Sequence, residues 1–303
     1  MAQNNTSSNA SAPGSSDGFQ CFRPVESFTV TMNVISLLIN SFHLCIISRL
    51  ETLKGTKYRC VLINIVLADI TNTMAMALFY SCYDFVLANY MHGEPEVRIP
   101  MSVSILISNY ISFHVFLVAS MEKYLAICKP FSYQSSVLVK WLPLNFVIVW
   151  LYVFSLGTII SLINVLNLIP GLGNLGNTVL RTAVFVVAPN LVSSTLLVKV
   201  YKEVKRIRNR SEISAQDDEK TNAAMYLIII FTLEMIVFLL NSITIIVIHS
   251  TGILVMGPIW SGFIKAPYTI LNTVIYGWRI QLYRRYVRKL FGCNQRRIGI
   301  AET

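Results

Sequence analysis

Apolar residues gather in seven long stretches along this chain, and short polar, mostly basic stretches separate them. A helix rises about 1.5 Å per residue, so roughly 20 apolar residues cross the ~30 Å hydrocarbon core of a membrane. Such stretches should be helical, because lipid offers no hydrogen-bond partner to a free backbone group. The predicted spans are Phe28–Ser48, Cys60–Leu87, Ile99–Met121, Trp141–Leu168, Thr178–Val200, Asn222–His249 and Ile253–Gly277. The pattern predicts an all-α membrane protein with a seven-transmembrane helix bundle.

Composition agrees with this prediction, and the distribution of charge indicates an orientation. Of the 303 residues 54% are hydrophobic and only 13% are charged, whereas a soluble domain carries about 25% charged residues. Four basic residues follow the first span, three the third and seven the fifth, and seven lie in the tail, 21 of the 25. Because Lys and Arg favour the cytoplasmic side, we expect a multi-pass plasma-membrane protein with an extracellular N-terminus and a cytoplasmic C-terminus. Contact with anionic membrane lipids explains the net charge of +10 without nucleic acid.

The predicted organisation has four parts. Residues 1–27 form an extracellular, disordered tail, and residues 28–277 form the transmembrane domain. Residues 278–292 form a short amphipathic helix along the inner leaflet, and residues 293–303 form the cytoplasmic tail. The extracellular tail is expected to be glycosylated, because it carries acceptor patterns at Asn4, Asn5 and Asn9.

Three of the six cysteines carry predictions that stay open between two interpretations. Cys21 and Cys82 are placed toward the oxidising side of the membrane, where they either form a disulfide or remain reduced. Cys293 follows a basic amphipathic stretch, where it is either palmitoylated or a free thiol.

A short motif closes the third predicted span. Ser120–Gln134 reads SMEKYLAICKPFSYQ, in which the apolar run ends in an acid, a base and a tyrosine, followed by an apolar step and Lys-Pro. This motif resembles the inner end of the third helix in rhodopsin-like (class A) G-protein-coupled receptors. Further positions of that family occur in order along residues 28–292: Asn40, LAD ending at Asp69, Trp150, Pro189 and LNTVIYGWR at Leu271–Arg279. SMEKYLAICKPF and ILNTVIYGWR are most similar to the odorant-receptor branch, particularly the odorant-receptor-like genes of fish.

The resemblance implies which residues carry activation and G-protein coupling. In the family, the basic residue of the triplet engages the neighbouring acid and an acid on the sixth helix. The residues at the corresponding places are Glu122, Lys123, Tyr124, Glu219, Asn272 and Tyr276. The basic stretch VYKEVKRIRNR is expected to extend the fifth helix and, with Phe131 and Tyr133, to meet the G protein. Binding to lipid headgroups is a simpler interpretation of the basic face, and the two are compatible.

Several positions depart from the family pattern. Lys123 replaces an arginine, Thr273 replaces the proline of the seventh-helix motif, and the predicted sixth helix contains no proline. Arg98 stands where the family places a disulfide cysteine. Lysine lacks the planar fork of guanidinium, so we expect a weaker latch of the inactive state, with higher basal activity or poorer coupling. Alternatively, Lys123 is only a basic anchor at the membrane edge.

Three charged residues lie deep in predicted spans, where an isolated charge costs at least about 2.5 kcal/mol. The resemblance implies that Asp69 contributes to a sodium site with Ser112 and Asn272, and Asn40 occupies a further matching position. The alternative is a carboxylate held by hydrogen bonds and water alone. Glu234 and Lys265 either pair with each other or are accommodated separately.

The ligand pocket is predicted to open outward between the third, fifth, sixth and seventh helices. Its candidate wall residues are Ile105, Asn109, Tyr110, Arg181, Phe185, Asn241, Thr244, Gly262 and Lys265. Ile105 occupies the place of an aspartate in amine receptors, which argues against an amine ligand. Arg181 either accepts a carboxylate or extends to the outer headgroups. Opsins place the retinal-binding lysine six residues before the motif asparagine, whereas Lys265 lies seven before Asn272, so retinal is not expected as a cofactor.

The resulting functional prediction is a chemosensory receptor that binds a small extracellular ligand in the helix bundle and activates a heterotrimeric G protein. The sequence shows no metal-ligand cluster, nucleophile–base pair or phosphate loop, so we do not expect an enzyme. Alternatives are a receptor-fold protein with little or no signalling that acts as a partner, chaperone or decoy, and a receptor for peptides or lipids. A transporter or channel is disfavoured, because neither an internal repeat nor the short broken helices of transporters can be read from the sequence.

Overall fold

The computed structural model describes residues 23–50, 56–81, 95–166, 186–209, 221, 224–233, 235–237, 240, 267–271, 273–275 and 287–288. The regular elements in these ranges are helices. They are α2 (Arg23–Arg49), α3 (Lys57–Ser81), α5 (Pro95–Cys128), α6 (Pro130–Tyr133), α7 (Val137–Lys140), α8 (Leu142–Val165) and α10 (Ala188–Arg208). A shorter apolar helix follows at Ala224–Val237, and residues 267–271 and 273–275 are also helical.

Four helices are long and apolar enough to cross a membrane. Their spans are Ser27–Arg49 of α2, Lys57–Leu78 of α3, Leu106–Cys128 of α5 and Leu142–Ile163 of α8. They overlap the first four predicted spans, with shifted ends. The apolar helix Ala224–Val237 and the segment 267–275 lie within the sixth and seventh predicted spans, whose remaining residues lie largely outside the described ranges.

Two helices continue further toward their C-terminal ends than the apolar pattern predicted. The third predicted span ended at Met121, which put Lys123 in a loop, but α5 continues to Cys128 and buries Lys123. The helix continues because Glu122 compensates the charge of Lys123 and Ile127 packs into an apolar cluster with α10. In the same way α10 continues past Val200 to Arg208, which confirms the predicted basic extension.

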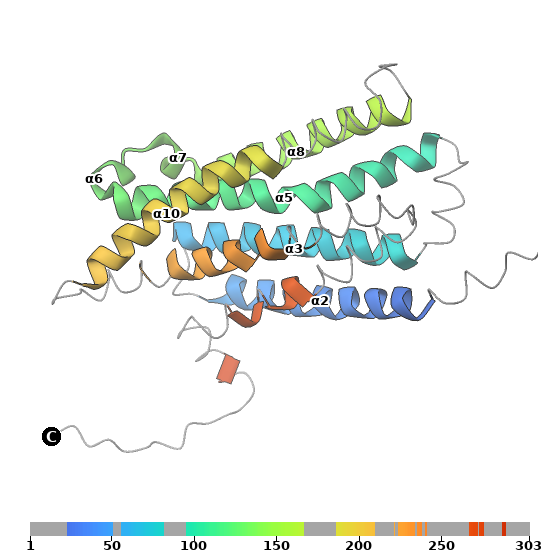
Figure 1. Cartoon of the computed structure of the whole chain (residues 1–303), viewed down its shortest axis with the longest axis horizontal. Helices are drawn as coiled ribbons and strands as arrows, with labels where there is room; N and C mark the ends of the chain where they lie inside the picture. Colours follow the sequence, from blue (N-terminus) through green and yellow to red (C-terminus); the bar gives the residue numbers. More distant parts are fainter. Residues whose placement is uncertain are drawn as a thin grey trace, which may run out of the picture.

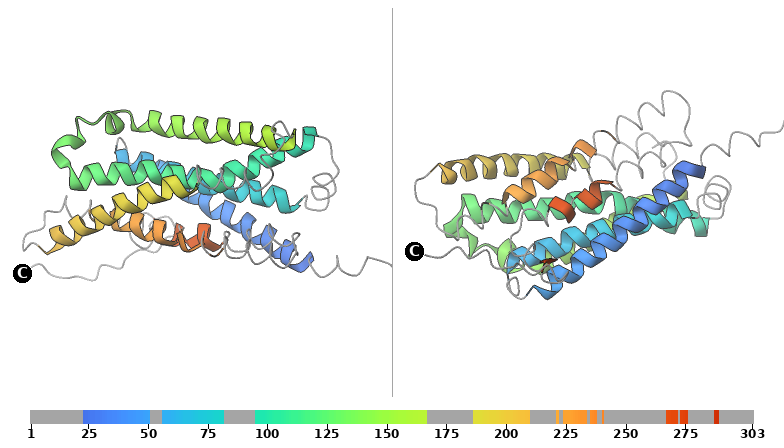
Figure 2. Two further views of the ribbon diagram at one scale, coloured as in Figure 1. Left: turned by 45° about the horizontal axis from the view of Figure 1, so that its top comes forward. Right: turned by 90° about the horizontal axis from the view of Figure 1, so that it is seen from below.

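Helix α5 is the centre of the bundle. It contacts α3, α8 and α10, and α2 packs on the far side of α3. In Figure 1 the helices α8, α5, α3 and α2 follow one another across the molecule, and α6 and α7 join α5 to α8 at one end. α10 crosses α5 obliquely in Figure 1 and lies alongside it in the right view of Figure 2. The end of α10 therefore lies at the same end of the bundle as α6 and α7.

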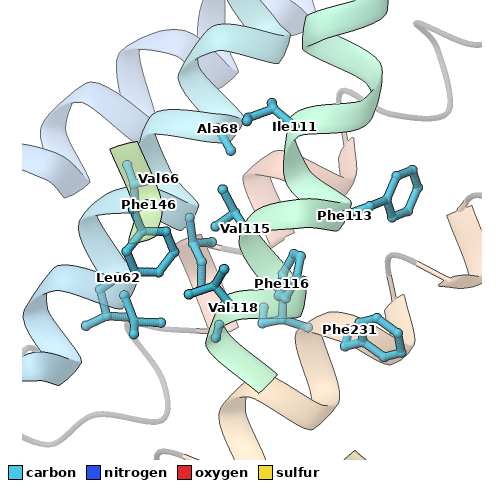
Figure 3. Close-up of a cluster of buried hydrophobic side chains, with 14 of the residues drawn as sticks. Leu62, Val66, Ala68, Ile111, Phe113, Val115, Phe116, Val118, Phe146 and Phe231 are labelled. Atoms are coloured by element: carbon cyan, nitrogen blue, oxygen red, sulfur yellow. The ribbon is translucent and has the colours of Figure 1, made fainter. Parts of the chain in front are cut away.

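The apolar core lies around α5, and the outer surface of the bundle at α8 is apolar as well. Val115, Phe116 and Val118 of α5 pack with residues of α3 and with Phe146 of α8 (Figure 3). The ring of Phe116 meets that of Phe231 edge-on, with centroids 6.1 Å apart. The outward surface of α8 is also apolar, with exposed leucine, isoleucine and phenylalanine side chains. An apolar outer surface of this extent fits contact with lipid.

Gly157 allows α8 to approach α5 closely. A Cβ at Gly157 would lie 3.6 Å from Cγ1 of Ile107 and 3.9 Å from Cβ of Leu106, which is ordinary van der Waals contact. Small residues let membrane helices pack closely in this way. The contact leaves room for a methyl group, and a larger side chain would meet Ile107 and Leu106.

We expect Gly157→Ala to leave the thermal unfolding temperature of the detergent-solubilised protein unchanged or slightly raised, because the methyl group fits and alanine favours the helix. Gly157→Leu should destabilise the protein by about 1–3 kcal/mol, because it overpacks the contact with Ile107. Equal losses in the two variants would contradict this account of the interface.

Candidate functional site

A buried ion pair lies near the end of α5. The ammonium of Lys123 approaches Oε2 of Glu122 at 2.8 Å, and only 8% and 2% of the two side chains are exposed. Adjacent positions of a helix normally point apart, so other groups must bring these side chains together. The hydroxyl of Tyr133 in α6 is one of them, since it donates a hydrogen bond of 2.7 Å to Oε1 of Glu122.

The Lys123 ammonium also faces an aromatic ring on α3. It lies 4.8 Å from the ring centroid of Tyr58, within the distance of a cation–π interaction. Lys123 therefore joins α5 to α3, and Glu122 joins α5 to α6. The alternative of a basic anchor at the membrane edge requires an ammonium directed to the headgroups, whereas here it is buried against an acid and a ring.

Tyr124 points to a third neighbour. Its ring lies 5.8 Å from the Lys199 ammonium of α10 and 5.9 Å from that of Lys129. It packs beside the apolar cluster in which Ile127 meets Val200. Three consecutive residues of α5 thus contact α6, α3 and α10, so a displacement of any of these helices changes the surroundings of the triplet.

Charge burial makes this arrangement sensitive to the loss of a partner. Removing one member of a buried ion pair costs about 3–5 kcal/mol, because the other charge is left uncompensated.

Tyr133 keeps its proton, because burial and then the neighbouring Glu122 carboxylate raise the pKa of its hydroxyl well above the usual value. The hydroxyl therefore donates to Glu122 at every physiological pH.

A second polar group ties the first helix to the seventh predicted span. Ser36 and Asn40 lie four residues apart on α2, and Thr269 and Thr273 lie four residues apart in the segment at 267–275, which runs beside α2 in Figure 1. The hydroxyls of Ser36 and Thr269 share a short hydrogen bond. The Thr273 hydroxyl donates to Oδ1 of Asn40 at 3.0 Å, and Nδ2 of Asn40 donates to the Ser36 carbonyl at 2.9 Å.

Thr273 is the residue that departs from the family's proline, and its role follows from these bonds. A proline has no side-chain hydroxyl, whereas the Thr273 hydroxyl satisfies the buried carbonyl oxygen of Asn40. The two residues on α2 have the same four-residue spacing as the two threonines that face them. The Ser36–Thr269 and Asn40–Thr273 hydrogen bonds therefore form at successive helical turns. Ser36, Asn40, Thr269 and Thr273 therefore form a polar clamp between α2 and the segment at 267–275.

The carboxylate expected at a sodium site is buried. Asp69 of α3 and Ser112 of α5 are both buried, and in sequence they follow Ala68 and Ile111, two residues of the apolar core (Figure 3). Their oxygen donors fit a hard cation. Asn40 is directed to Thr273 instead. Because Asn272 lies outside the described residues, the complete sodium site stays a prediction.

The predicted ligand pocket lies mostly outside the described structure. Tyr110 is half-buried on α5 and packs against the core. Ile105 and Asn109 lie in α5, but their side chains are outside the described part. The other predicted residues outside the described ranges are Arg181, Phe185, Glu219, Glu234, Asn241, Thr244, Gly262, Lys265, Asn272, Tyr276, Asn4, Asn5, Asn9, Cys21, Cys82 and Cys293.

The sequence analysis did not identify several residues that contact the triplet or form the polar clamp. Tyr58 gave no signal, because a tyrosine near the start of a span is common at membrane interfaces. Tyr133 was expected to face a G protein, but it is half-buried and bonded to Glu122, whereas its neighbour Phe131 is fully exposed. A signal for Ser36 and Thr269 was available, since each precedes another polar residue by four positions.

No protein-family model matches the sequence, and no curated protein matches it significantly. The resemblance to receptors therefore depends on the order of the motifs along the chain. Among the described residues, the polar contacts of the motif residues are concentrated at the Glu122–Lys123–Tyr124 triplet and at the polar clamp formed by Ser36, Asn40, Thr269 and Thr273.

The clamp generates a prediction about stability. Thr273→Val removes the donor to Asn40 and should destabilise the protein by about 0.6–1.7 kcal/mol, the range of hydrogen bonds between membrane helices. Thr273→Ser keeps the hydroxyl and serves as the control. Thermal unfolding of single and double variants with Asn40→Ala measures the coupling. Additive losses in the double variant would show that the two side chains act independently.

Tyr133→Phe should destabilise the protein by about 1.5 kcal/mol, because a hydrogen bond to a charged carboxylate is lost. A raised pKa means that this contribution is complete below the usual tyrosine value of about 10 and disappears only as pH rises through the raised value. The difference between wild type and variant should therefore stay constant between about pH 6 and 9. Tyr201→Phe, at an exposed position of α10, is the matched control. A difference that varies across this range, or one no larger than the control, would contradict the assignment.

Proposed function

We propose that this protein is a seven-helix, rhodopsin-like receptor of the chemosensory, odorant-receptor type, located in the plasma membrane. It binds a small extracellular ligand within the helix bundle and activates a heterotrimeric G protein at the cytoplasmic end. The observation that carries the proposal is the Glu122–Lys123–Tyr124 triplet at the end of the central helix. Its three side chains contact α6, α3 and α10, so the relative positions of these helices determine whether the ion pair stays closed.

The proposed orientation places the triplet at the cytoplasm. Lys57 at the start of α3, Lys129 and Lys140 around α6 and α7, and the basic last turn of α10 all lie at one end of the bundle (Figure 1). The positive-inside rule makes this end cytoplasmic and the N-terminus extracellular. The remaining spans are the fifth, sixth and seventh predicted from the sequence, which complete the seven-helix topology.

The same end offers a surface for a G protein. Phe131 is fully exposed on α6, beside the bonded Tyr133. Across from it, α10 carries five exposed basic residues in its last ten positions, and anionic lipid headgroups are attracted to the same face. An exposed aromatic anchor and a basic helix suit a partner helix with apolar and acidic residues.

Activation then consists of opening the triplet. In the closed state, the Lys123 ammonium is held by Glu122 and by the Tyr58 ring. An agonist that stabilises a displaced α10 changes the contact between Tyr124 and Lys199 and weakens this closed state. A sodium ion at Asp69 and Ser112 would favour the closed bundle by compensating the buried carboxylate.

A receptor-fold protein with weak or absent signalling is the second candidate. The observation that favours it is the lysine at position 123, which forms the ion pair without the bidentate fork of arginine. Such a protein would act as a partner, chaperone or decoy. Surface expression without G-protein turnover distinguishes this candidate from a working receptor.

We expect Lys123→Arg to lower basal G-protein activation by about five-fold, because a bidentate pair with Glu122 strengthens the closed state by about 1 kcal/mol. Lys129→Arg, at an exposed position six residues further on, is the control and should leave the output unchanged. Turnover is measured in cells with equal surface expression. Equal output from Lys123→Arg and wild type would show that the ion pair is no latch, and silence of wild type and both variants would favour the second candidate.

A further inference from the structure

A groove of about 520 Å³ lies between α3 and α8. Its basic end adjoins the triplet site, because the Lys57 ammonium lies 5.8 Å from the ring centroid of Tyr133. On α3 it is lined by Cys60, Asn64, Leu67 and Thr71, which form one stripe along the helix. Cys60 and Thr71 are 11 helical steps apart, so the stripe is about 16 Å long at helical rise. It begins one turn after Lys57, the first residue of α3. The groove thus extends from the basic end of the bundle over about half of a ~30 Å hydrocarbon core, which is the depth of one leaflet.

The polar atoms of the groove are already satisfied by the protein. Nε1 of Trp150 donates to Oδ1 of Asn64 at 3.2 Å, and Nδ2 of Asn64 donates to the Cys60 carbonyl at 2.9 Å. The Thr71 hydroxyl donates to the Leu67 carbonyl at 2.9 Å. The groove therefore presents mainly apolar surface to an occupant, and Leu67 and Val147 are exposed at its lipid-facing side. An apolar chain fits this surface, and a polar solute does not.

The mouth of the groove is basic on both sides. Lys57 precedes Cys60 by three residues, and Lys140 precedes the lining residue Pro143 by three. The Lys57 ammonium donates to the carbonyl of Val139, the neighbour of Lys140, so both lysines lie at the same corner. Lys140 is exposed, and beside it Trp141 is exposed as well, as is typical at a membrane interface. A phosphate at this corner would meet positive charge.

We propose that this groove binds one acyl chain of an anionic glycerophospholipid of the cytoplasmic leaflet, with the phosphate at Lys140 and Lys57. The length of the stripe, the satisfied polar groups and the paired lysines each point to this occupant. The proposal rests on the membrane orientation given above and not on receptor signalling. It makes the lipid a tightly held component of the bundle, distinct from the exchanging lipid around it.

The proposal is tested by native mass spectrometry of the delipidated, full-length protein in detergent, titrated with phosphatidylglycerol or with phosphatidylcholine of the same chains. Wild type should bind one phosphatidylglycerol at least about five-fold more tightly than phosphatidylcholine, since each lysine near the lipid surface contributes about that factor. Lys140→Gln should remove about five-fold of this preference, and Lys202→Gln, exposed on α10, should not.

A second pair of variants tests the groove itself. Val147→Phe fills it from the lipid-facing side and should abolish retention of the lipid, whereas Ile148→Phe should retain it, because that side chain is outside the groove. The two positions are 51% and 53% exposed, so both changes spare the core. Leu67→Phe provides a second filling variant from α3. Equal binding by Val147→Phe and Ile148→Phe, equal affinity for the two phospholipids, or displacement of the bound lipid by a sterol would each overturn the proposal. G protein is absent from these measurements, so their failure would leave the receptor proposal untouched.

Discussion

The fold depends on how helices that are long and apolar enough to cross a membrane compensate their buried polar and charged groups. Hydrocarbon solvates neither a free backbone group nor an isolated charge, so each must find its partner within the protein. Near the end of α5, Glu122 and Lys123 compensate each other, and Tyr133 and Tyr58 complete the arrangement. Because these partners come from α6 and α3, satisfying one ion pair also fixes the relative positions of three helices. Packing at Gly157 and around Phe116 then holds the rest of α5 in the centre of the bundle.

The polar clamp between α2 and the segment at 267–275 follows the same rule at a greater separation in sequence. Ser36 and Thr269 are 233 residues apart, and so are Asn40 and Thr273. The equal spacing places both pairs in register, so the polar side chains are hydrogen-bonded and the two helices pack in one specific alignment. The clamp and the triplet lie on different helices but share a consequence. In each, a residue that differs from the receptor pattern makes a specific contact: Thr273 bonds to Asn40, and Lys123 pairs with Glu122.

Much of the helical architecture could be predicted from the sequence, because the apolar length of a span is set by the membrane. The first four predicted spans overlap α2, α3, α5 and α8. Their ends were less predictable, since Lys123 terminates the apolar pattern without terminating the helix. Long-range partners were not predictable either: Tyr58 and Tyr133 are ordinary residues in sequence and become part of the site through the helix arrangement. The hydrogen bond of Tyr133 to Glu122 was not predictable, because the sequence suggested only a place for Tyr133 at the inner surface.

The central claim is that the end of the bundle with the triplet faces the cytoplasm, since receptor coupling and the lipid proposal both require it. Labelling of a single cysteine tests it most directly. Ser135→Cys places an exposed thiol between α6 and α7, in a background whose native cysteines are replaced. A membrane-impermeant maleimide is applied to intact cells and then to permeabilised cells. The account predicts labelling only after permeabilisation, while an N-terminal tag is reached by antibody in intact cells. Labelling of Ser135→Cys in intact cells would contradict the orientation and both proposals that depend on it.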